Sequence, residues 1–388
     1  MSPSLLITHA EIMTPTAHIE RGWLLTRDHA IAALGWGDPP ENTDAQVIDA
    51  AGQTLLPGFI DVHVHGGAGT EAMDATRDAL TTMAQFYARH GVTSFLATTW
   101  TDSRSRVQAA LEAIAAAQGR QPNGATILGA HIEGPYLNPE RCGAQSTTYI
   151  RRAERDEALA FLDTGVVRLM ALAPEYPENH WLIRECVRRG ITVSAAHTAA
   201  TYEQMQAAIA IGLTQGTHTG NAMTGLHHRE PGTLGAVLTM PQIKAELIAD
   251  NIHIHPAVMH LIYLAKGANG VILISDAIRG AGMPDGEYHL DDRTVTVKDG
   301  VVTLPNGTLA GSTLTMDRAV RNFMSATGEP LSAIWQTSSL NAARAIGVSA
   351  RKGSLEVGKD ADLVLVDSDI NVALTVAEGQ IVYQAIPS

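Results

Sequence analysis

The chain has 388 residues, of which 45% are hydrophobic, so it can bury one barrel-sized core with or without a smaller module. Its formal net charge of -13 argues against nucleic acid as a partner, because phosphate-backbone binding needs a concentrated basic surface. Two cysteines cannot form a disulfide framework, and neither a secretion signal nor a run long enough to cross a membrane is visible. We therefore expect a cytoplasmic protein that does not bind membranes.

The two ends of the chain share one sequence pattern. Residues 1–55 hold short strand-like runs broken by Gly, Pro and Asp, namely Ser4–Ile7, Trp23–Thr26 and Ala30–Leu34. Residues 354–388 repeat the pattern with Ala361–Asp367 and Gln380–Tyr383. Runs of this kind are typical of strands. We predict one small β-sandwich domain assembled from residues 1–55 and 350–388.

The central part, residues 56–349, alternates short apolar runs with longer Ala-rich stretches such as Arg104–Gln118 and Tyr202–Gly212, which have helical spacing. The apolar runs lie near 58–64, 92–98, 126–132, 166–173, 191–196, 213–218, 244–250 and 270–276. About eight strand–helix pairs predict an α/β fold, a (β/α)8 TIM-like barrel. A doubly wound open sheet remains the alternative, because periodicity does not separate the two.

Three further elements are predicted after the eighth run. Residues 287–304 form an inserted hairpin, with a turn at Lys298-Asp299-Gly300. Arg318–Thr327 and Leu331–Ile346 are expected to be helices.

Polar side chains recur where the predicted barrel strands end, and in a barrel those ends meet at one rim. His63 and His65 lie on the first strand with the same-face spacing of alternate residues. The later strand ends add the carboxylates and imidazoles of Glu133, His197, His218 and Asp276. Imidazole and carboxylate suit Zn²⁺ or Fe²⁺, and Asp276 suits a base that takes a proton from metal-bound water. Each His alone could be a buried, hydrogen-bonded imidazole, but five strand ends together indicate a metal-dependent hydrolase.

Several motifs then carry a resemblance that runs almost from end to end. They are PGFIDVHVHG (57–66), HIEGP (131–135), NAM (221–223), HHREPG (227–232), DNIH (250–253), SDA (275–277), LAGSTLT (309–315) and GKDADLV (358–364). With these motifs the chain resembles the amidohydrolase superfamily and, within it, the N-acetylglucosamine-6-phosphate deacetylases. The NAM and HREPG motifs are the more specific part.

The resemblance implies hydrolysis of the acetamide of N-acetyl-D-glucosamine 6-phosphate to the free amine and acetate. It implies one or two divalent ions, Zn²⁺ or Fe²⁺, the first held by Glu133, His197 and His218 and the second by His63 and His65 with Glu133. Asp276 matches the catalytic base. The residues implied to bind the phosphorylated amino sugar are Asn221, Ala222, His228, Arg229, His253 and Leu309. The His228–Arg229 segment is implied to reach a neighbouring subunit's site, hence a homodimer.

Two positions depart from the family pattern. RCGAQ (141–145) places Gln145 where the family has a His that polarises the acetyl carbonyl, and Thr219-Gly220 replaces two larger residues. A Gln amide still donates a hydrogen bond to an oxyanion but carries no charge, so Gln145 remains a catalytic candidate. The alternatives are deacetylation of N-acetylgalactosamine 6-phosphate or another N-acyl amino sugar, and a non-catalytic homologue. A cyclic-amide hydrolase is disfavoured, because Glu133 stands where that branch often carries a carboxylated Lys.

Overall fold

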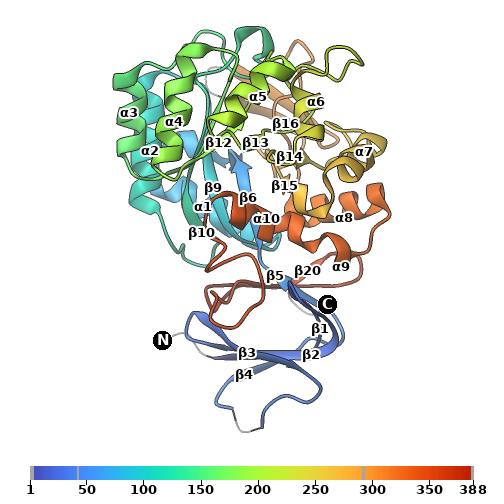
Figure 1. Cartoon of the computed structure of the whole chain (residues 1–388). Coiled ribbons are helices and arrows are strands. Elements are labelled where there is room, and N and C mark those ends of the chain that lie inside the picture. Colours follow the sequence, from blue (N-terminus) through green and yellow to red (C-terminus); the bar gives the residue numbers. More distant parts are fainter. Residues whose placement is uncertain (1–3, 42, 291–292, 386–388) are drawn as a thin grey trace.

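A computed structural model describes residues 4–41, 43–290 and 293–385 of the chain. It consists of a barrel wrapped by helices and a β-rich part built from both ends of the chain (Figure 1). The backbone passes from the β-rich part into the barrel between β5 (Thr54–Pro57) and β6 (Phe59–Val64), where Gly58 N donates to Asp362 O at 2.9 Å. The barrel strands therefore begin near the terminal β part and end at the opposite rim.

Eight parallel strands form the barrel in chain order. They are β6, β9 (Val92–Thr99), β10 (Thr126–Glu133), β11 (Val167–Leu172), β12 (Thr192–Ala195), β13 (Gln215–Gly216), β14 (Lys244–Ile248) and β15 (Val271–Ile274). Beyond the end of β15, Asp276 N donates to His63 O at 2.9 Å, which brings the last strand back to the first. The predicted (β/α)8 barrel is confirmed, and this closure excludes the open doubly wound sheet.

The helices pack outside the barrel (Figure 1). They are α1 (Arg77–Ala88), α2 (Arg104–Ala117), α3 (Arg155–Asp163), α4 (His180–Arg188), α5 (Tyr202–Ala210), α6 (Gly232–Thr239), α7 (Pro256–Lys266), α8 (Met316–Thr327), α9 (Leu331–Ile334) and α10 (Leu340–Ala345). In α2, Ser103 caps the first turn by accepting from Arg106 N. Val107, Ala110, Leu111 and Ile114 repeat at helical spacing and are buried.

The terminal β part is a second eight-stranded sheet with its own apolar core, which includes Leu5, Ile7, Leu363 and Leu365. Its strands are β1 (Leu5–Met13), β2 (His18–Arg27), β3 (Ala30–Trp36), β4 (Gln46–Asp49), β5, β19 (Leu363–Val366), β20 (Val372–Ala377) and β21 (Gln380–Gln384). β19 pairs antiparallel with β5, so the two ends of the chain share one sheet, as the sequence predicts.

The inserted element is larger than a hairpin. It is a three-stranded antiparallel sheet of β16 (Gly286–Leu290), β17 (Arg293–Lys298) and β18 (Val301–Thr303). Asp299 and Gly300 have φ of +52° and +80°, which is the turn predicted between the last two strands. A separate two-stranded ladder joins β7 (Gly66–Gly67) to β8 (Thr70–Glu71).

The single helix predicted over Leu331–Ile346 is wrong in detail, because it breaks between α9 and α10. Thr337 Oγ1 donates to Ile334 O at 2.8 Å, and Ser338 Oγ donates to Trp335 O at 2.9 Å. Hydroxyl side chains that bond to nearby carbonyls compete with the helical ladder, and here they hold a 3-10 turn over Trp335–Ser338.

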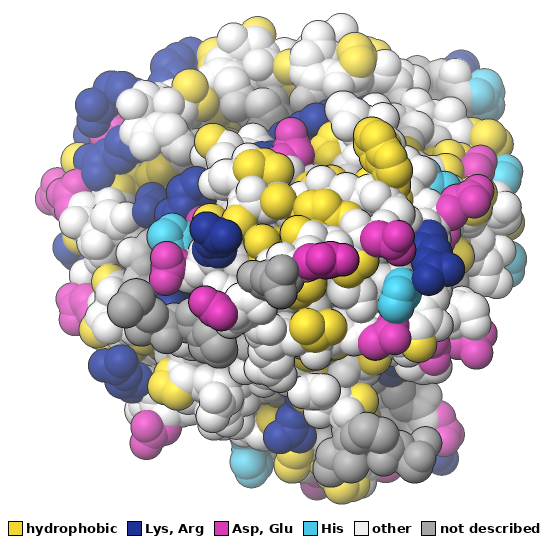
Figure 2. All heavy atoms as spheres, turned by 90° about the horizontal axis from the view of Figure 1, so that it is seen from below, with side chains coloured by type: hydrophobic (Ala, Val, Ile, Leu, Met, Phe, Trp, Pro, Cys, Tyr) yellow, Lys and Arg dark blue, Asp and Glu magenta, His cyan; other side chains and the backbone are white. Residues whose placement is uncertain are grey.

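The face seen from below carries charges of both signs, with Lys, Arg, Asp and Glu side chains around a group of hydrophobic ones (Figure 2). Within the described residues, no helix combines the length and apolar content needed to cross a membrane.

Candidate active site

The polar residues predicted at the strand ends do meet at one rim. Glu133 is the last residue of β10, and His63 lies near the end of β6. His197, His218 and Asp276 each follow a barrel strand by two residues and have φ of +43°, +29° and +50°. Left-handed backbone at residues other than Gly costs roughly 1–3 kcal/mol each and concentrates at functional sites. The backbone therefore turns sharply where these side chains enter the rim.

Glu133 and two imidazoles form a first buried cluster. Glu133 Oε1 lies 3.0 Å from His218 Nε2 and 3.2 Å from His197 Nε2, and the two nitrogens are 3.2 Å apart. The other ring nitrogen of His197, Nδ1, bonds to Arg141 O at 2.9 Å, which orients the ring so that Nε2 faces the carboxylate.

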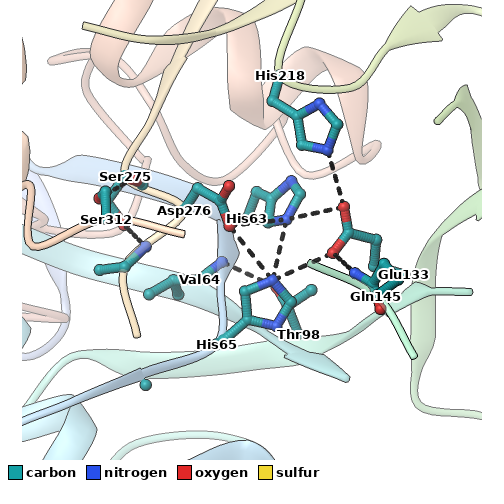
Figure 3. Close-up of polar contacts among 12 residues, drawn as sticks. His63, Val64, His65, Thr98, Glu133, Gln145, His218, Ser275, Asp276 and Ser312 are labelled. Atoms are coloured by element: carbon teal, nitrogen blue, oxygen red, sulfur yellow. Dashed lines mark hydrogen bonds and ion pairs between the residues drawn. The ribbon is translucent and has the colours of Figure 1, made fainter. Parts of the chain in front are cut away.

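The predicted His63–His65 pair forms a second cluster against the same carboxylate, with His65 beside its other oxygen and His63 Nε2 3.6 Å from Oε1. His65 Nε2 lies 3.2 Å from Glu133 Oε2, and His63 Nε2 lies 3.4 Å from His65 Nε2 (Figure 3). Asp276 Oδ1 is 3.4 Å from His63 Nε2 and 3.3 Å from His65 Nε2. Glu133 is thus shared by both clusters, and Asp276 lies beside the second.

The donor atoms fit divalent metal ions. In each cluster two imidazole nitrogens and a carboxylate oxygen all lie within 4.8 Å of one another, and all are buried. Two nitrogens bound to one tetrahedral Zn²⁺ at roughly 2.0–2.1 Å would be about 3.4 Å apart, close to the separations found here. Imidazole with carboxylate also suits Fe²⁺. The residues therefore fit one or two divalent ions.

Both carboxylates are held in their charged form. Burial alone would raise the pKa of Glu133, but the charge of His63 and hydrogen bonds from His197 and His218 hold it well below its usual range. Burial likewise opposes ionisation of Asp276, and His63 and His65 outweigh it to lower that pKa. An ionised carboxylate is the form that binds a metal ion or accepts a proton.

A cavity of about 370 Å³ opens above the clusters. Its lining includes the catalytic candidate Gln145 and four of the six predicted substrate residues, Asn221, Ala222, His253 and Leu309. Gly311, also in the lining, has φ of +63°, and an added Cβ would lie 2.9 Å from Asp276 O. Only Gly fits there, and the next residue, Ser312, donates its N–H to Asp276 O at 2.8 Å.

His253 is fixed within this cavity by a carboxylate. Its Nδ1 lies 2.6 Å from Asp250 Oδ2, while Asp250 Oδ1 accepts from the backbone N–H groups of Ile252 and His253. Burial lowers the pKa of His253, and Asp250 outweighs this and raises it. Nε2 is the ring nitrogen left for an anionic ligand.

His228 and Arg229 are the predicted residues that lie outside the cavity. Both are exposed, with His228 Nε2 2.6 Å from one terminal nitrogen of Arg229, and Arg229 instead lines a neighbouring hollow. Arg141 lines both spaces. It ends a 3-10 turn over Pro139–Arg141, between β10 and α3, and although it begins the RCGAQ stretch, the family resemblance assigns it no role.

Gln145 is hydrogen-bonded at both ends of its amide. Nε2 donates to Glu133 Oε2 at 2.6 Å, and Oε1 accepts from Thr101 N at 2.9 Å (Figure 3). A primary amide has two N–H groups, so one orients Glu133 and the other is left for a ligand. The neutral side chain can therefore hold the shared carboxylate without adding charge to the clusters.

One functional candidate is not predicted by the sequence motifs. Glu246, on β14, is fully buried, and its Oε2 lies 3.5 Å from His63 Nδ1. A carboxylate behind a ligating imidazole fixes the ring's tautomer and orientation. The signal that could have identified Glu246 from the sequence is a charged residue inside an otherwise buried strand.

We expect Glu246→Gln to weaken metal binding at His63 and His65 by roughly 10- to 100-fold, because it removes the charge behind the imidazole. Metal content after dialysis, measured by elemental analysis, should fall while the ion held by His197 and His218 is retained. Equal loss from both clusters, or loss from neither, would contradict this role.

Comparisons with known proteins agree with this geometry. A family model described as "Amidohydrolase family" matches residues 54–382. The N-acetylglucosamine-6-phosphate deacetylase of Bacillus subtilis (strain 168) is 38% identical over 388 residues, covering 99% of this chain and 98% of that protein. The N-acetylgalactosamine-6-phosphate deacetylase of Escherichia coli is 40% identical over 370 residues, covering 93% and 96%.

A solved structure is also similar to this chain in fold and sequence. It is a mutant N-acetyl-D-glucosamine-6-phosphate deacetylase from Mycobacterium smegmatis, in complex with N-acetyl-D-glucosamine-6-phosphate. It superposes with a TM-score of 0.92 at 33% identity, covering 98% of this chain and 100% of that one. The resemblance found in the motifs is confirmed. This chain belongs to the amidohydrolase family and, within it, to the N-acetylglucosamine-6-phosphate deacetylases.

Proposed function

We propose that this chain hydrolyses the acetamide of N-acetyl-D-glucosamine 6-phosphate, giving acetate and the free amine. The observation that carries the proposal is that the two His–Glu clusters share Glu133, which lines one cavity together with Asp276 and four of the six sugar-binding candidates. Curated relatives that cover nearly the whole chain bear the corresponding name. One relative bears the galacto name, so the C4 epimer is the control substrate.

In this proposal Glu133, His197 and His218 hold a divalent ion, and His63 and His65 with Glu133 hold a second. Such an ion supplies Lewis acidity toward the carbonyl and makes water more acidic. We keep Zn²⁺ and Fe²⁺ as the two candidates.

Asp276 is the proposed general base. Its carboxylate takes a proton from the attacking water and then passes it to the departing amine nitrogen as the C–N bond breaks. The free N–H of Gln145 is oriented by the bond to Glu133 and donates to the acyl oxygen as negative charge develops there.

The remaining cavity residues bind the sugar phosphate. Asn221, Ala222 and Leu309 contact the sugar, and His253, whose pKa is raised, faces the anionic end. Because His228 and Arg229 are exposed outside the cavity of their own chain, we propose that they complete the phosphate site of a partner in a homodimer. Cys142 and Cys186 are free thiols, as suits the proposed cytoplasmic location.

The test is acetate release by protein loaded with Zn²⁺ or Fe²⁺. N-acetylglucosamine 6-phosphate is compared with its galacto epimer and with unphosphorylated N-acetylglucosamine. A strong preference for the gluco phosphate is expected. A preference for the galacto phosphate would change the substrate, and no release from any of the three would overturn the proposed reaction.

We expect Arg229→Ala to raise KM for the phosphorylated substrate by roughly 10- to 100-fold, because a hydrogen bond to a charged group contributes about 1.5–3 kcal/mol. Turnover of the unphosphorylated sugar should not change. Arg155→Ala, which removes an exposed guanidinium stacked on Trp181, is the control and should leave both KM values unchanged. An equal effect of Arg229→Ala on both substrates would remove the phosphate role.

A further inference from the structure

Trp100 lines the cavity and has no role in the reaction described so far. It directly follows the second barrel strand, β9, and is 2% exposed. Its ring stacks on His65, with centroids 3.8 Å apart and planes 13° from parallel. It shares the cavity lining with Glu133 and Gln145. A large aromatic side chain therefore closes the cavity beside the second His–Glu cluster.

The indole N–H of Trp100 is an unused donor. Nε1 is buried and has no hydrogen-bond partner among the described residues. Buried donors are nearly always hydrogen-bonded, because a buried donor without a partner destabilises the folded protein. Two neighbouring donors are paired within the protein: Thr101 N bonds to Gln145 Oε1 at 2.9 Å, and one N–H of Gln145 Nε2 bonds to Glu133 Oε2 at 2.6 Å, which leaves its second N–H free. An unpartnered donor on a residue that lines the cavity suits a group supplied by a ligand.

The order of the barrel strands indicates which end of the substrate lies beside Trp100. Trp100 follows the second strand, whereas Asn221 and His253 follow β13 and β14, the sixth and seventh. In a closed barrel of eight strands, the second and sixth lie on opposite sides. The metal-ligand clusters lie at the rim between them. A substrate with its sugar at Asn221 and His253, and its amide at the clusters, directs its acyl group toward Trp100.

We propose that Trp100 recognises the acyl group: its ring closes the acyl end of the cavity, and Nε1–H donates to the acyl oxygen. This inference rests on the proposed deacetylase function. It assigns Trp100 as a specificity-determining residue that favours a short acyl chain, because the ring occupies the space a longer chain would need.

Trp100→Phe is the variant that tests the donor. It removes Nε1–H but keeps an aromatic ring to stack on His65, so the metal content should equal that of the wild type. We expect kcat/KM for the N-acetyl substrate to fall by about 10- to 100-fold, somewhat less than the loss of a main oxyanion donor. Trp181→Phe is the matched control, since Trp181 Nε1 bonds to Ala153 O at 3.1 Å outside the cavity.

A second measurement separates recognition from a structural effect. Binding of a non-hydrolysable phosphonamidate analogue of the tetrahedral intermediate, measured by calorimetry, should weaken by the same factor in Trp100→Phe and not in Trp181→Phe. Trp100→Ala should raise the ratio of N-butyryl to N-acetyl hydrolysis, because it opens the acyl end.

The outcomes distinguish the two proposals. No acetate release by the wild type overturns the proposed function itself. An active wild type whose Trp100→Phe variant keeps kcat/KM and analogue affinity within twofold overturns only the role of Trp100. Loss of metal from Trp100→Phe would also overturn it, because the effect would then come from His65.

Discussion

Replacing Asp276 with Asn is expected to lower kcat by about 10²- to 10⁴-fold, the range that a positioned general acid–base contributes. The amide has nearly the same shape but does not accept a proton from water. Metal content should remain near normal, because Glu133, His197 and His218 are unchanged. Steady-state kinetics and elemental analysis of the same sample give both quantities.

Asp317→Asn is a suitable control for this experiment. It makes the same chemical change on α8, where Asp317 Oδ2 lies 3.3 Å from His90 Nδ1, outside the cavity. It should leave kcat unchanged. If Asp276→Asn retained turnover at a normal metal content, Asp276 would not be the base.

The second large effect is expected from Glu133→Gln. Glu133 is the carboxylate shared by both clusters, with Oε1 toward His197 and His218 and Oε2 toward His65. A neutral amide removes the negative charge from both, so we expect loss of metal from both sites. Activity should fall by roughly 10³-fold, because the ions supply several kcal/mol of transition-state stabilisation.

The control for Glu133→Gln is Glu185→Gln on the surface of α4, where the side chain pairs with Arg188 and Arg189. Elemental analysis should show a full metal complement in the control and depletion in Glu133→Gln. Retention of one ion would show that Glu133 serves a single cluster, and retention of both would show that it is not a ligand.

Local sequence patterns were sufficient for the elements that depend on short-range periodicity. All eight barrel strands overlap the predicted apolar runs, and the ends of β6 and β10 carry the predicted His and Glu. The reason is physical: buried parallel strands need continuous apolar runs, and polar groups at their ends are tolerated only at the open rim. At Thr337 and Ser338, side chains compete with the backbone for hydrogen bonds. There the same periodicity predicted one continuous helix where the structure has two.

The family resemblance added residues that periodicity does not reveal. Asn221 and His253 come from motifs, and the structure places both in the cavity wall. Arg229 comes from a motif as well, but it lies outside the cavity of its own chain. Motif matching identifies which residue types recur together, whereas their separation in space depends on the loops that carry them.

The sequence by itself therefore determined the eight strands, the joining of the two ends and the residue types at the rim. The family resemblance also implied that Glu133 serves both His pairs, and the two clusters agree with it. Only the tertiary structure decided that the sheet closes and that Glu246 lies behind His63. It also placed Trp100 in the cavity lining and left its indole N–H without a partner among the described residues. These contacts join residues on different strands, and their distances follow from barrel closure and side-chain packing, which local periodicity does not encode.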